Sequence, residues 1–357
     1  MRQSLPASTP SGAATEPQTD LRFNAATLLY PGEEKFLANV KQLTSEGENA
    51  EAYLSFDNTQ LVFQTHVAAA GCDQIYTMNL DGSHKKLVST GKGRTTCSYF
   101  LPDGKSILYA STHLADEKCP PPPDFSKGYT WALYKGYDIF FASLDSLGDG
   151  QNVRRITATD GYDAEATVSP TGDKIIFTSV RDGDLELYEM DITGNRVKRL
   201  TTHTGYDGGA FYSPDGQKIV FRASTPKDAA EEKSYKELLA AGLIRPTKLD
   251  IFTMNSDGSG RRQLTDNGKA NFAPFFLPNN RQIIFSSNLS DERGRNFDLY
   301  LINDDGSALT RISFGPEFEG FPVFTKDGKK IIFSSNRNSK QRGETNVFIA
   351  DWIYKGN

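Results

Sequence analysis

The stretch "SPDGQKIVF" at residues 213–221, followed by "DIFTMNSDGSGRRQLT" at residues 250–265, decides the fold of this chain. A Ser-Pro-Asp-Gly turn leads into a run of β-branched and aromatic residues, and two further runs follow, separated by a polar turn. Short runs of this kind, bounded by Gly, Asn and Asp, are typical of β-strands. The stretch therefore predicts consecutive antiparallel strands.

The same pattern recurs along the chain. The turn reappears at residues 55–58, 101–104, 169–172, 213–216, 277–280 and 325–328, at intervals of 44 to 68 residues. A further strand precedes each turn, as in "GYDAEATVSP" (161–170) and "GYDGGAFYSP" (205–214). Four strands in a unit of this length predict a propeller blade. The longer intervals carry insertions at 112–136 and 224–248, and the second contains a helical stretch over 228–242 that we expect Pro246 to end.

The two ends of the chain complement each other. The last unit stops after its third strand, "NVFIADW" (346–352), whereas an unmatched fourth strand, "VKQLT" (40–44), precedes the first turn. An open sandwich array would leave both half-units unpaired, and unpaired strand edges invite aggregation. We therefore predict an all-β fold, a single six-bladed propeller of four-stranded antiparallel blades, closed by pairing of the N-terminal strand into the C-terminal blade.

The composition of the chain indicates the extent of the domain and limits the kinds of partner that it can bind. Residues 26–357 are assigned to the propeller, and residues 1–25, rich in Ser, Thr, Ala and Pro and without the apolar run of a signal peptide, are predicted to be a disordered leader. The 40 basic and 45 acidic residues give a net charge of −5, which argues against nucleic-acid binding. No apolar stretch is long enough for a transmembrane segment. We expect a monomer.

Superposing the six inner strands by register gives two sets of equivalent positions. The first set is predicted to surround the mouth of the central channel, on the face that carries both insertions, and comprises Asn49, Thr95, Asp163, Asp207, Asn271 and Glu319. The second set lies two residues further on, on the same side of each strand, and comprises Glu51, Cys97, Glu165, Gly209, Ala273 and Phe321.

Several ligands suit such a mouth. Oxygen-rich side chains bind hard divalent cations such as calcium, and the same groups could receive a basic segment of a partner or hydrogen-bond a sugar. The alternative is a hydrated mouth in which Asp and Asn serve the turns. Because like charges raise one another's proton affinity, we expect a compensating positive charge, for which Arg94, Arg181 and Arg222 are candidates. No cofactor is otherwise expected.

Aromatic and histidine residues also belong to this face. Tyr129 and Trp131, in the first insertion, could form a platform for a sugar or peptide, or could pack over the blade rim. His66, His113 and His203 are candidate metal ligands together with Asp163 and Asp207, although the histidines lie in different blades without short ligand spacing.

The chemistry of the site leaves two functions open. No GxSxG, HExxH or Walker motif is present, which favours a non-catalytic binding propeller that recognises a protein, peptide or glycan at the insertion-bearing face. The alternative is a carbohydrate-active lyase or hydrolase with a carboxylate site in the channel, possible metal assistance, and Glu51 and Glu165 as catalytic candidates. Such an enzyme would carry a buried carboxyl with a displaced pKa.

The repeated pattern resembles the PD40 repeat of the TolB-like (WD40-like) propellers over about residues 38–357. This resemblance implies a bacterial periplasmic or secreted protein. In an exported protein, Cys72 and Cys119, in second-to-third-strand loops of neighbouring blades, are the expected disulfide pair. Cys97, in an inner strand, is then the expected buried free thiol.

Overall fold

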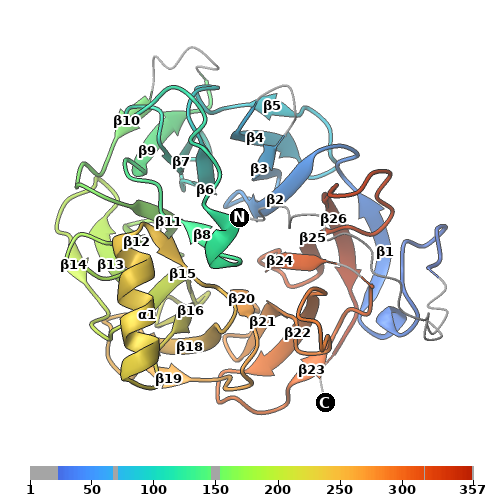
Figure 1. Cartoon of the computed structure of the whole chain (residues 1–357). Helices are drawn as coiled ribbons and strands as arrows, with labels where there is room; N and C mark the ends of the chain where they lie inside the picture. The colour runs from blue at the N-terminus through green and yellow to red at the C-terminus, as the bar shows by residue number, and fades with distance from the viewer. Residues whose placement is uncertain (1–22, 67–70, 146–152, 317, 356–357) are drawn as a thin grey trace.

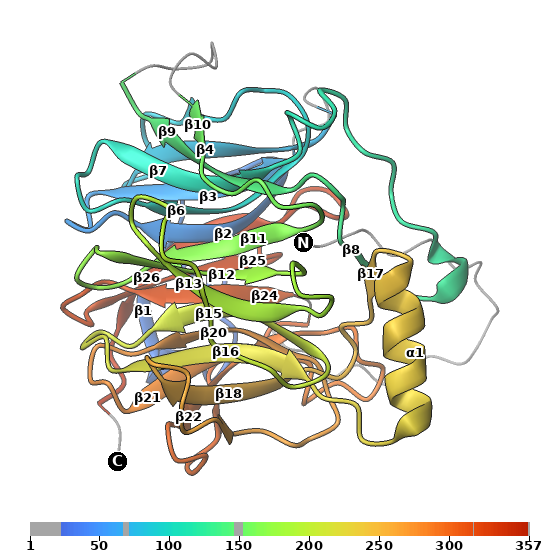
Figure 2. The same ribbon diagram turned by 90° about the vertical axis from the view of Figure 1, so that its left-hand side faces the viewer.

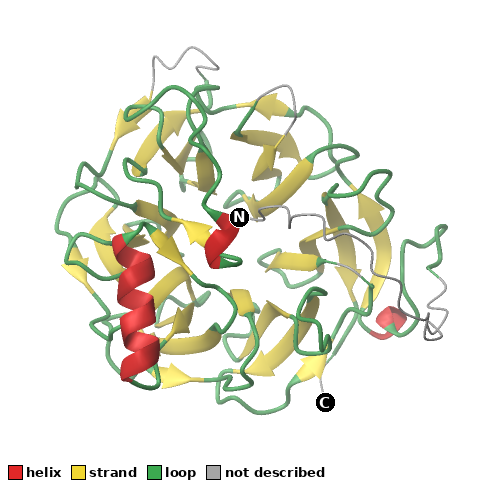
Figure 3. Ribbon diagram, viewed as in Figure 1, coloured by secondary structure: helices red, strands yellow, loops and turns green. Residues whose placement is uncertain are grey.

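The computed structural model describes residues 23–66, 71–145, 153–316 and 318–355. Six four-stranded antiparallel sheets stand around a central channel, with the inner strand of each sheet nearest the axis (Figure 1; Figure 3). The predicted all-β six-bladed propeller is confirmed.

Each blade is one meander of strands, numbered here in chain order. Blade 1 contains β2 (Glu48–Leu54), β3 (Gln60–His66), β4 (Asp73–Asn79) and β5 (Lys86–Leu87); blade 2 contains β6 (Thr95–Phe100), β7 (Ser106–Ser111), β9 (Asp138–Ser143) and β10 (Val153–Arg155); blade 3 contains β11 (Asp163–Val168), β12 (Lys174–Ser179), β13 (Glu186–Asp191) and β14 (Lys198–Arg199). Blade 4 contains β15 (Tyr206–Tyr212), β16 (Lys218–Ser224), β18 (Asp250–Asn255) and β19 (Arg262–Gln263); blade 5 contains β20 (Asn271–Phe276), β21 (Gln282–Ser287), β22 (Asp298–Asn303) and β23 (Thr310–Arg311); blade 6 contains β24 (Glu319–Phe324), β25 (Lys330–Ser335), β26 (Asn346–Trp352) and β1 (Leu37–Gln42).

The recurring turn joins the first two strands of a blade through its own side chains. In blade 4 the Ser213 hydroxyl donates to Asp215 Oδ1 at 2.6 Å, and the same oxygen accepts from the Gln217 amide at 3.0 Å. Gly216 follows with φ +72, in the left-handed region where glycine carries no Cβ penalty. The turn chemistry therefore starts each buried second strand, such as the Ile219–Phe221 segment, whose three residues are all fully buried.

The N-terminal strand closes the ring, as predicted. β1 pairs antiparallel with β26, with Leu37 opposite Trp352 and Gln42 opposite Phe348. It begins three residues before the predicted 40–44 strand, because Leu37 is also buried in the core of blade 6. The last two predicted residues still hold β26, since the Leu43 amide donates to the Val347 carbonyl at 2.8 Å.

An ion-pair network fastens the segment before β1. Arg337, after β25, is 2% exposed and donates to both oxygens of Glu33, at 3.0 and 3.1 Å, and to the Leu28 carbonyl at 2.9 Å. Its guanidinium also contacts the Glu319 carboxylate. Glu33 is fully buried in the short 3-10 helix η1 (Glu33–Lys35). Breaking a buried ion pair is strongly destabilising, because the remaining charge is left without compensation.

The two insertions build one structure on one face, which we call the lid (residues 112–136 and 224–248). The first contains η3 (Phe125–Lys127) and β8 (Trp131–Ala132), and the second contains α1 (Ala229–Ala240) and β17 (Leu243–Ile244). β8 and β17 pair with each other, and Figure 2 shows both strands beside α1 on the same side of the propeller. The two insertions therefore lie against each other through this strand pair.

The residues at the two ends of α1 differ from the prediction at the C-terminal end. Asp228 caps its first turn by accepting from the Ala230 and Glu231 amides at 2.8 and 2.9 Å. The helix ends at Ala240, and Gly242 follows with φ +70. The prediction that Pro246 ends the helix is wrong, because a glycine in the left-handed conformation terminates it earlier.

A disulfide ties the lid to blade 1. Cys72 and Cys119 are bonded, with their Cα atoms 5.6 Å apart, as predicted. Cys97 is the free cysteine, but it is half-buried rather than buried because it lines the channel. Among the residues that the structure describes, no helix is both long and apolar enough to cross a membrane.

Residues 1–22 lie outside the described residues, so the predicted leader stays a prediction. We expect deletion of residues 1–22 to leave the melting temperature nearly unchanged and deletion of residues 1–45 to abolish folding. The longer deletion removes β1, with buried Leu37 and Val40, and leaves Arg337 without Glu33. Several buried side chains at about 1.5–3 kcal/mol each approach a typical total stability of about 5–15 kcal/mol. Circular dichroism melting and size-exclusion chromatography would check this, and a folded longer-deletion variant would refute the closure argument.

Candidate functional site

A β-bulge at the same place in every inner strand shapes the channel. The pairing of first and second strands shifts register once in each of the six blades. The residue at each bulge has a left-handed φ between +49 and +58, and these residues are the predicted second set: Glu51, Cys97, Glu165, Gly209, Ala273 and Phe321. Bulges bend a strand and redirect a side chain. The repeat therefore turns one residue per blade toward the axis.

These six residues line one small pocket in the channel, together with Tyr53, Ala166, Thr167, Phe211 and Arg222. The structure thus places Glu51 and Glu165 on the wall of the same hollow. Arg222, on β16, is one of the three arginines expected to supply a compensating positive charge. We call this hollow the channel pocket.

Glu165 and Arg222 form the central pair of the channel pocket. Glu165 accepts from the Thr178 hydroxyl at 2.8 Å, the Tyr206 hydroxyl at 3.0 Å and the Gly209 amide at 2.9 Å, and its carboxylate contacts the Arg222 guanidinium. The pKa of Arg222 is raised: desolvation by burial lowers it, but the Coulombic attraction of Glu165, together with the smaller effects of Tyr206, Cys97 and Glu51, outweighs desolvation. The carboxylate oxygens of Glu165 are therefore occupied by the protein itself.

The lid reaches this pair through Trp131. The Arg222 guanidinium carbon lies 5.3 Å from the centroid of the Trp131 ring and 5.5 Å from that of Tyr206. Trp131 is half-buried and donates from its indole N–H to the Tyr129 hydroxyl at 3.2 Å. Trp131, one of the two aromatic residues predicted as a platform, thus packs against Arg222 and Tyr206 of blade 4, and Tyr129 contacts Trp131 within the lid.

The first set occupies a different environment. All six residues are at most 2% exposed, and the carboxylates among them are each paired with an arginine of their own blade: Asp163 with Arg181 at 3.1 Å, Asp207 with Arg261 at 3.2 Å, and Glu319 with Arg337. These side chains fasten the start of an inner strand, and the compensation of charge that we expected occurs blade by blade.

A short sequence pattern marks two of these arginines. Arg181 and Arg337 both follow a serine that ends a second strand by two positions, and each donates to that serine as well as to the inner-strand acid. In blade 2 the corresponding position is His113, and the inner-strand residue is the uncharged Thr95. The sequence itself contains this Ser-x-Arg pattern together with an acidic first-set residue. Arg261 and Arg337 were not among the residues predicted from the sequence.

The predicted metal ligands do not gather. In the described ranges, no group of three or more His, Cys, Asp or Glu side chains could hold a metal ion. His66 lies 3.4 Å from Asp73, His113 shares a 2.8 Å hydrogen bond with Ser111, and His203 is exposed. The hydrogen bond that His66 donates to Asp73 raises the pKa of His66, whereas burial lowers the pKa of His113.

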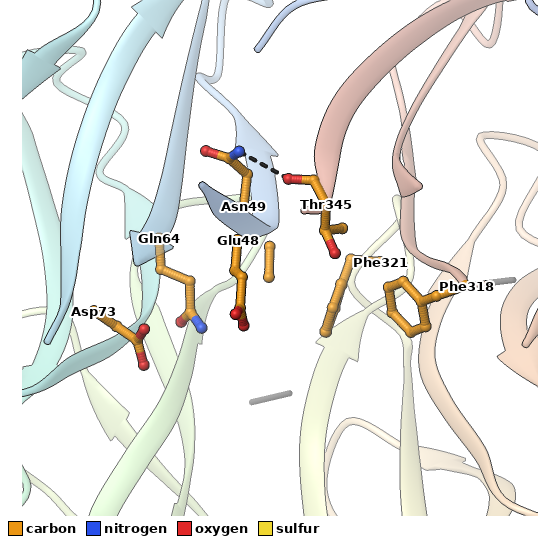
Figure 4. Close-up of a pocket in the computed structure, with 8 residues that line it drawn as sticks. Glu48, Asn49, Gln64, Asp73, Phe318, Phe321 and Thr345 are labelled. Atoms are coloured by element: carbon orange, nitrogen blue, oxygen red, sulfur yellow. Dashed lines mark hydrogen bonds between the residues drawn. The ribbon is translucent and has the colours of Figure 1, made fainter. Parts of the chain in front are cut away.

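A second hollow, the mouth pocket, adjoins the channel pocket. It is lined by Glu48, Asn49, Ala50, Gln64, Asp73, Phe318, Phe321 and Thr345, and Phe321 belongs to both pockets. Figure 4 shows Glu48, Gln64 and Asp73 on one side and the rings of Phe318 and Phe321 on the other. The Nη2 atom of Arg94, a predicted site residue, lies 3.6 Å from Asp73 Oδ2. Sequence reasoning found Asn49 here but not Glu48, Gln64, Asp73 or Phe318.

Comparisons with known proteins agree with this architecture. A family model described as the TolB beta propeller domain (PD40) matches residues 135–237. The Tol-Pal system protein TolB of Bordetella pertussis is 45% identical over 49 residues, which cover 14% of this chain and 11% of that relative. The match therefore spans about a tenth of the relative's length, and the chain carries TolB-like PD40 repeats.

Solved structures show the same fold. A putative TolB from Agrobacterium tumefaciens has 19% identity and a TM-score of 0.54, covering 86% of this chain and 91% of that one. TolB from Acinetobacter baumannii has 16% identity and a TM-score of 0.55, covering 85% and 63%. An oligogalacturonate lyase in complex with manganese has 14% identity and a TM-score of 0.51, covering 93% and 95%. At these identities the likeness concerns the fold alone.

Substitution of Gly209 tests the channel pair. The backbone at this position accepts a side chain in other blades, as at Ala273, but a Cβ on Gly209 would lie 2.0 Å from Arg222 Nη1. We expect Gly209→Ala to displace Arg222 and to lower the unfolding free energy by about 3–5 kcal/mol, the usual range for a broken buried ion pair. Gly104→Ala is the matched control, since Gly104 has φ +64 with no atom within 4 Å, and should lose only about 1–2 kcal/mol. Equal losses in urea titrations would contradict the steric argument.

Asp207 makes a distinct pH prediction. Burial raises its pKa to about 7, against the opposing effect of Arg261 and with a further increase from Glu186. Its folded-state pKa thus exceeds its unfolded value, so the associated stability is present below about pH 4 and is lost as the pH rises toward 7. We expect Asp207→Asn to remove up to about 4 kcal/mol of this loss, at about 1.4 kcal/mol per pKa unit. The measurement is urea unfolding of both proteins from pH 4 to 7.

The control for this experiment is Asp57→Asn. The hydrogen bond from Ser55 lowers the pKa of Asp57, which is a turn residue with the opposite shift. Its removal should leave the slope of stability between pH 4 and 7 unchanged. Parallel stability curves for the wild type and Asp207→Asn would show that Asp207 stays ionised throughout this range.

Proposed function

We propose that this protein is a non-catalytic, monomeric binding propeller that recognises a segment of a partner protein at the lid-bearing face. The observation that carries the proposal is the pairing of β8 with β17, which joins two insertions of different blades into one lid on the face where the mouth pocket opens. Long insertions in compact domains are usually functional. Two insertions that fold onto each other form a surface that neither blade would make alone.

The peptide alternative has more support than the glycan alternative. A sugar platform needs an aromatic face open to the ligand, whereas Trp131 stacks over Arg222 and packs edge-on against Tyr206, with ring centroids 6.5 Å apart. The mouth pocket instead combines polar side chains of β2 and β3 with the rings of Phe318 and Phe321. Polar groups beside aromatic anchors are typical of protein-recognition sites.

The enzyme alternative has less support. A glycosidase-like mechanism needs two carboxyl groups that act on the substrate, but Glu165 is engaged by Thr178, Tyr206, Gly209 and Arg222. A carboxylate with these partners serves as an anchor for the arginine. We assign no cofactor and no divalent cation to the mouth.

An exported location fits the proposal. The Cys72–Cys119 bond links the lid to blade 1, and structural disulfides persist in oxidising compartments. We propose a periplasmic or secreted protein, for which the disulfide holds the binding surface in place.

A matched pair of exposed leucines tests the face that binds. Leu114, in the lid, is 59% exposed, and Leu309, between the third and fourth strands of blade 5 at the opposite face, is 45% exposed. Peptides would be selected on the wild-type protein from a random phage-displayed library, and their affinities measured by surface plasmon resonance. We expect Leu114→Glu to weaken the selected peptides at least tenfold and Leu309→Glu to leave them unchanged. The reverse order, or a selection that yields no lid-dependent peptide while an oligosaccharide array gives lid-dependent binding, would overturn the proposal.

A further inference from the structure

The Cys72–Cys119 disulfide lies outside the strands of the propeller. Cys72 directly precedes β4 of blade 1, whereas Cys119 belongs to the first insertion of the lid. Blade 1 is built by its own four paired strands, and no strand in the described ranges contains either cysteine. The bond therefore fastens the lid to the propeller without holding a blade together.

The two bonded residues differ in their accessibility to solvent. Cys72 is 2% exposed, whereas Cys119 is an exposed residue, as are all residues from Leu114 to Lys118. Exposed disulfides are the labile ones in exported proteins, while structural disulfides resist reduction by thiols. A thiolate can therefore reach this bond from the Cys119 side without any blade having to unfold.

A non-covalent path runs parallel to the disulfide. Asp73, the residue after the first cysteine, has its Oδ2 atom 3.6 Å from Arg94 Nη2. The Arg94 guanidinium carbon lies 5.7 Å from the centroid of the Tyr134 ring, and the Tyr134 hydroxyl donates to the Pro121 carbonyl at 2.9 Å. Pro121 lies two residues beyond the second cysteine. These contacts close a circuit with the disulfide, which we call the blade 1–lid circuit (Cys72, Asp73, Arg94, Tyr134, Pro121 and Cys119).

The non-covalent half of the circuit is weak. At 3.6 Å the contact between Asp73 and Arg94 is longer than a hydrogen bond, and a guanidinium near an aromatic ring or a single neutral hydrogen bond contributes modestly. Arg245 Nη2 also donates to the Lys127 carbonyl at 3.1 Å. Because a disulfide restricts the conformations of the loop that it closes, the covalent bond supplies the main restraint on residues 119–128.

The circuit also borders the mouth pocket. Asp73 lines that pocket, and it lies beside His66 at the end of β3 as well as beside Arg94. The backbone of Arg94 holds the start of the first insertion, since its carbonyl accepts from the Thr112 amide at 3.0 Å and its amide donates to the Thr112 hydroxyl at 3.0 Å. The disulfide thus lies where the lid and the wall of the mouth pocket meet.

From these observations we infer that Cys119 is the site at which a dithiol reduces the disulfide, and that reduction releases residues 119–128 from blade 1 while the propeller stays folded. One thiolate of the dithiol attacks Cys119 Sγ, the S–S bond breaks, and Cys72 leaves as a thiolate. The second thiol then displaces Cys119 from the mixed disulfide. The protein gains two electrons and two protons and ends with two thiols, and the dithiol is oxidised to a disulfide.

Reduction of the native full chain tests the accessibility of the bond. The probe is dithiothreitol at neutral pH, with free thiols trapped by N-ethylmaleimide and located by mass spectrometry. We expect Cys72 and Cys119 to be modified in nearly all molecules while the reduced protein still melts cooperatively by circular dichroism. Glutathione, which has one thiol, should leave its mixed disulfide on Cys119. A bond that opens only at urea concentrations that unfold the blades, or a mixed disulfide on Cys72, would overturn the inference.

Hydrogen exchange measured by mass spectrometry tests the release of the lid segment. We expect reduction to accelerate amide exchange at least tenfold in residues 119–128 and to leave the buried strand β21 unchanged. Acceleration in both segments would mean that the bond stabilises the whole propeller, and acceleration in neither would mean that the lid does not depend on it. Either result contradicts the inference.

Tyr134→Phe tests whether the two halves of the circuit act in parallel. This substitution removes the hydroxyl that donates to Pro121 but keeps the ring beside Arg94. We expect it to accelerate exchange in residues 119–128 less than threefold in the oxidised protein and at least tenfold in the reduced protein, because the disulfide holds the segment when it is intact. An equal effect in both redox states would refute the circuit.

The matched control for this substitution is Tyr212→Phe. It also removes a tyrosine hydroxyl that donates a hydrogen bond, here to Glu189 Oε2 at 2.9 Å between blades 4 and 3. Because these residues lie outside the lid, exchange in residues 119–128 should be unchanged in both redox states.

The consequence for binding rests on the proposed function. Because a released segment must be ordered again on binding, phage-selected peptides should bind the reduced protein at least tenfold more weakly, and an unchanged affinity would overturn the control of binding by the bond. If no selected peptide depends on Leu114, the proposed function fails, whereas the reduction and exchange measurements still decide the inference about the disulfide.

Discussion

Six inner strands must approach one axis, and a regular antiparallel ladder would send their side chains alternately to the two sheet faces rather than into the channel. The bulge that recurs in each first strand removes this difficulty, because it bends the strand and places one residue per blade in a left-handed conformation. At Phe321 this conformation is unfavourable for a bulky side chain. The ring around it fixes the strand there, and the channel pocket exists because of this constraint.

Charge is distributed around the ring in two layers. The outer layer consists of carboxylates at the start of inner strands, each paired with an arginine of the same blade, as Asp163 is with Arg181. These pairs replace charge repulsion across the mouth by attraction within a blade. The inner layer, at the bulges, contains Glu165 and Arg222, whose pairing joins blade 3 to blade 4. The lid contacts the inner layer through Trp131, whose ring lies beside the Arg222 guanidinium.

The sequence predicted the fold well because the fold is a repeat. Turn residues such as Ser213 and Asp215 act within five residues of one another, so their role can be recognised from a short stretch of sequence. Strand closure was also predictable, since counting the strands showed one missing from the last unit and one unmatched strand before the first. The Cys72–Cys119 pair followed from the same register. The helix end failed because Gly242 and Pro246 are both terminators and the nearer one acts first.

The sequence by itself determined the six blades, their closure by β1, and which residue of each inner strand is equivalent to which. It could not determine which set of equivalent residues faces the channel. A bulge changes the direction in which the side chains of a strand point, and its position is defined only by the pairing of two strands. The mouth pocket was likewise decided by the tertiary structure alone. Glu48 and Phe318 stand 270 residues apart, and they meet only because ring closure brings the first blade against the last.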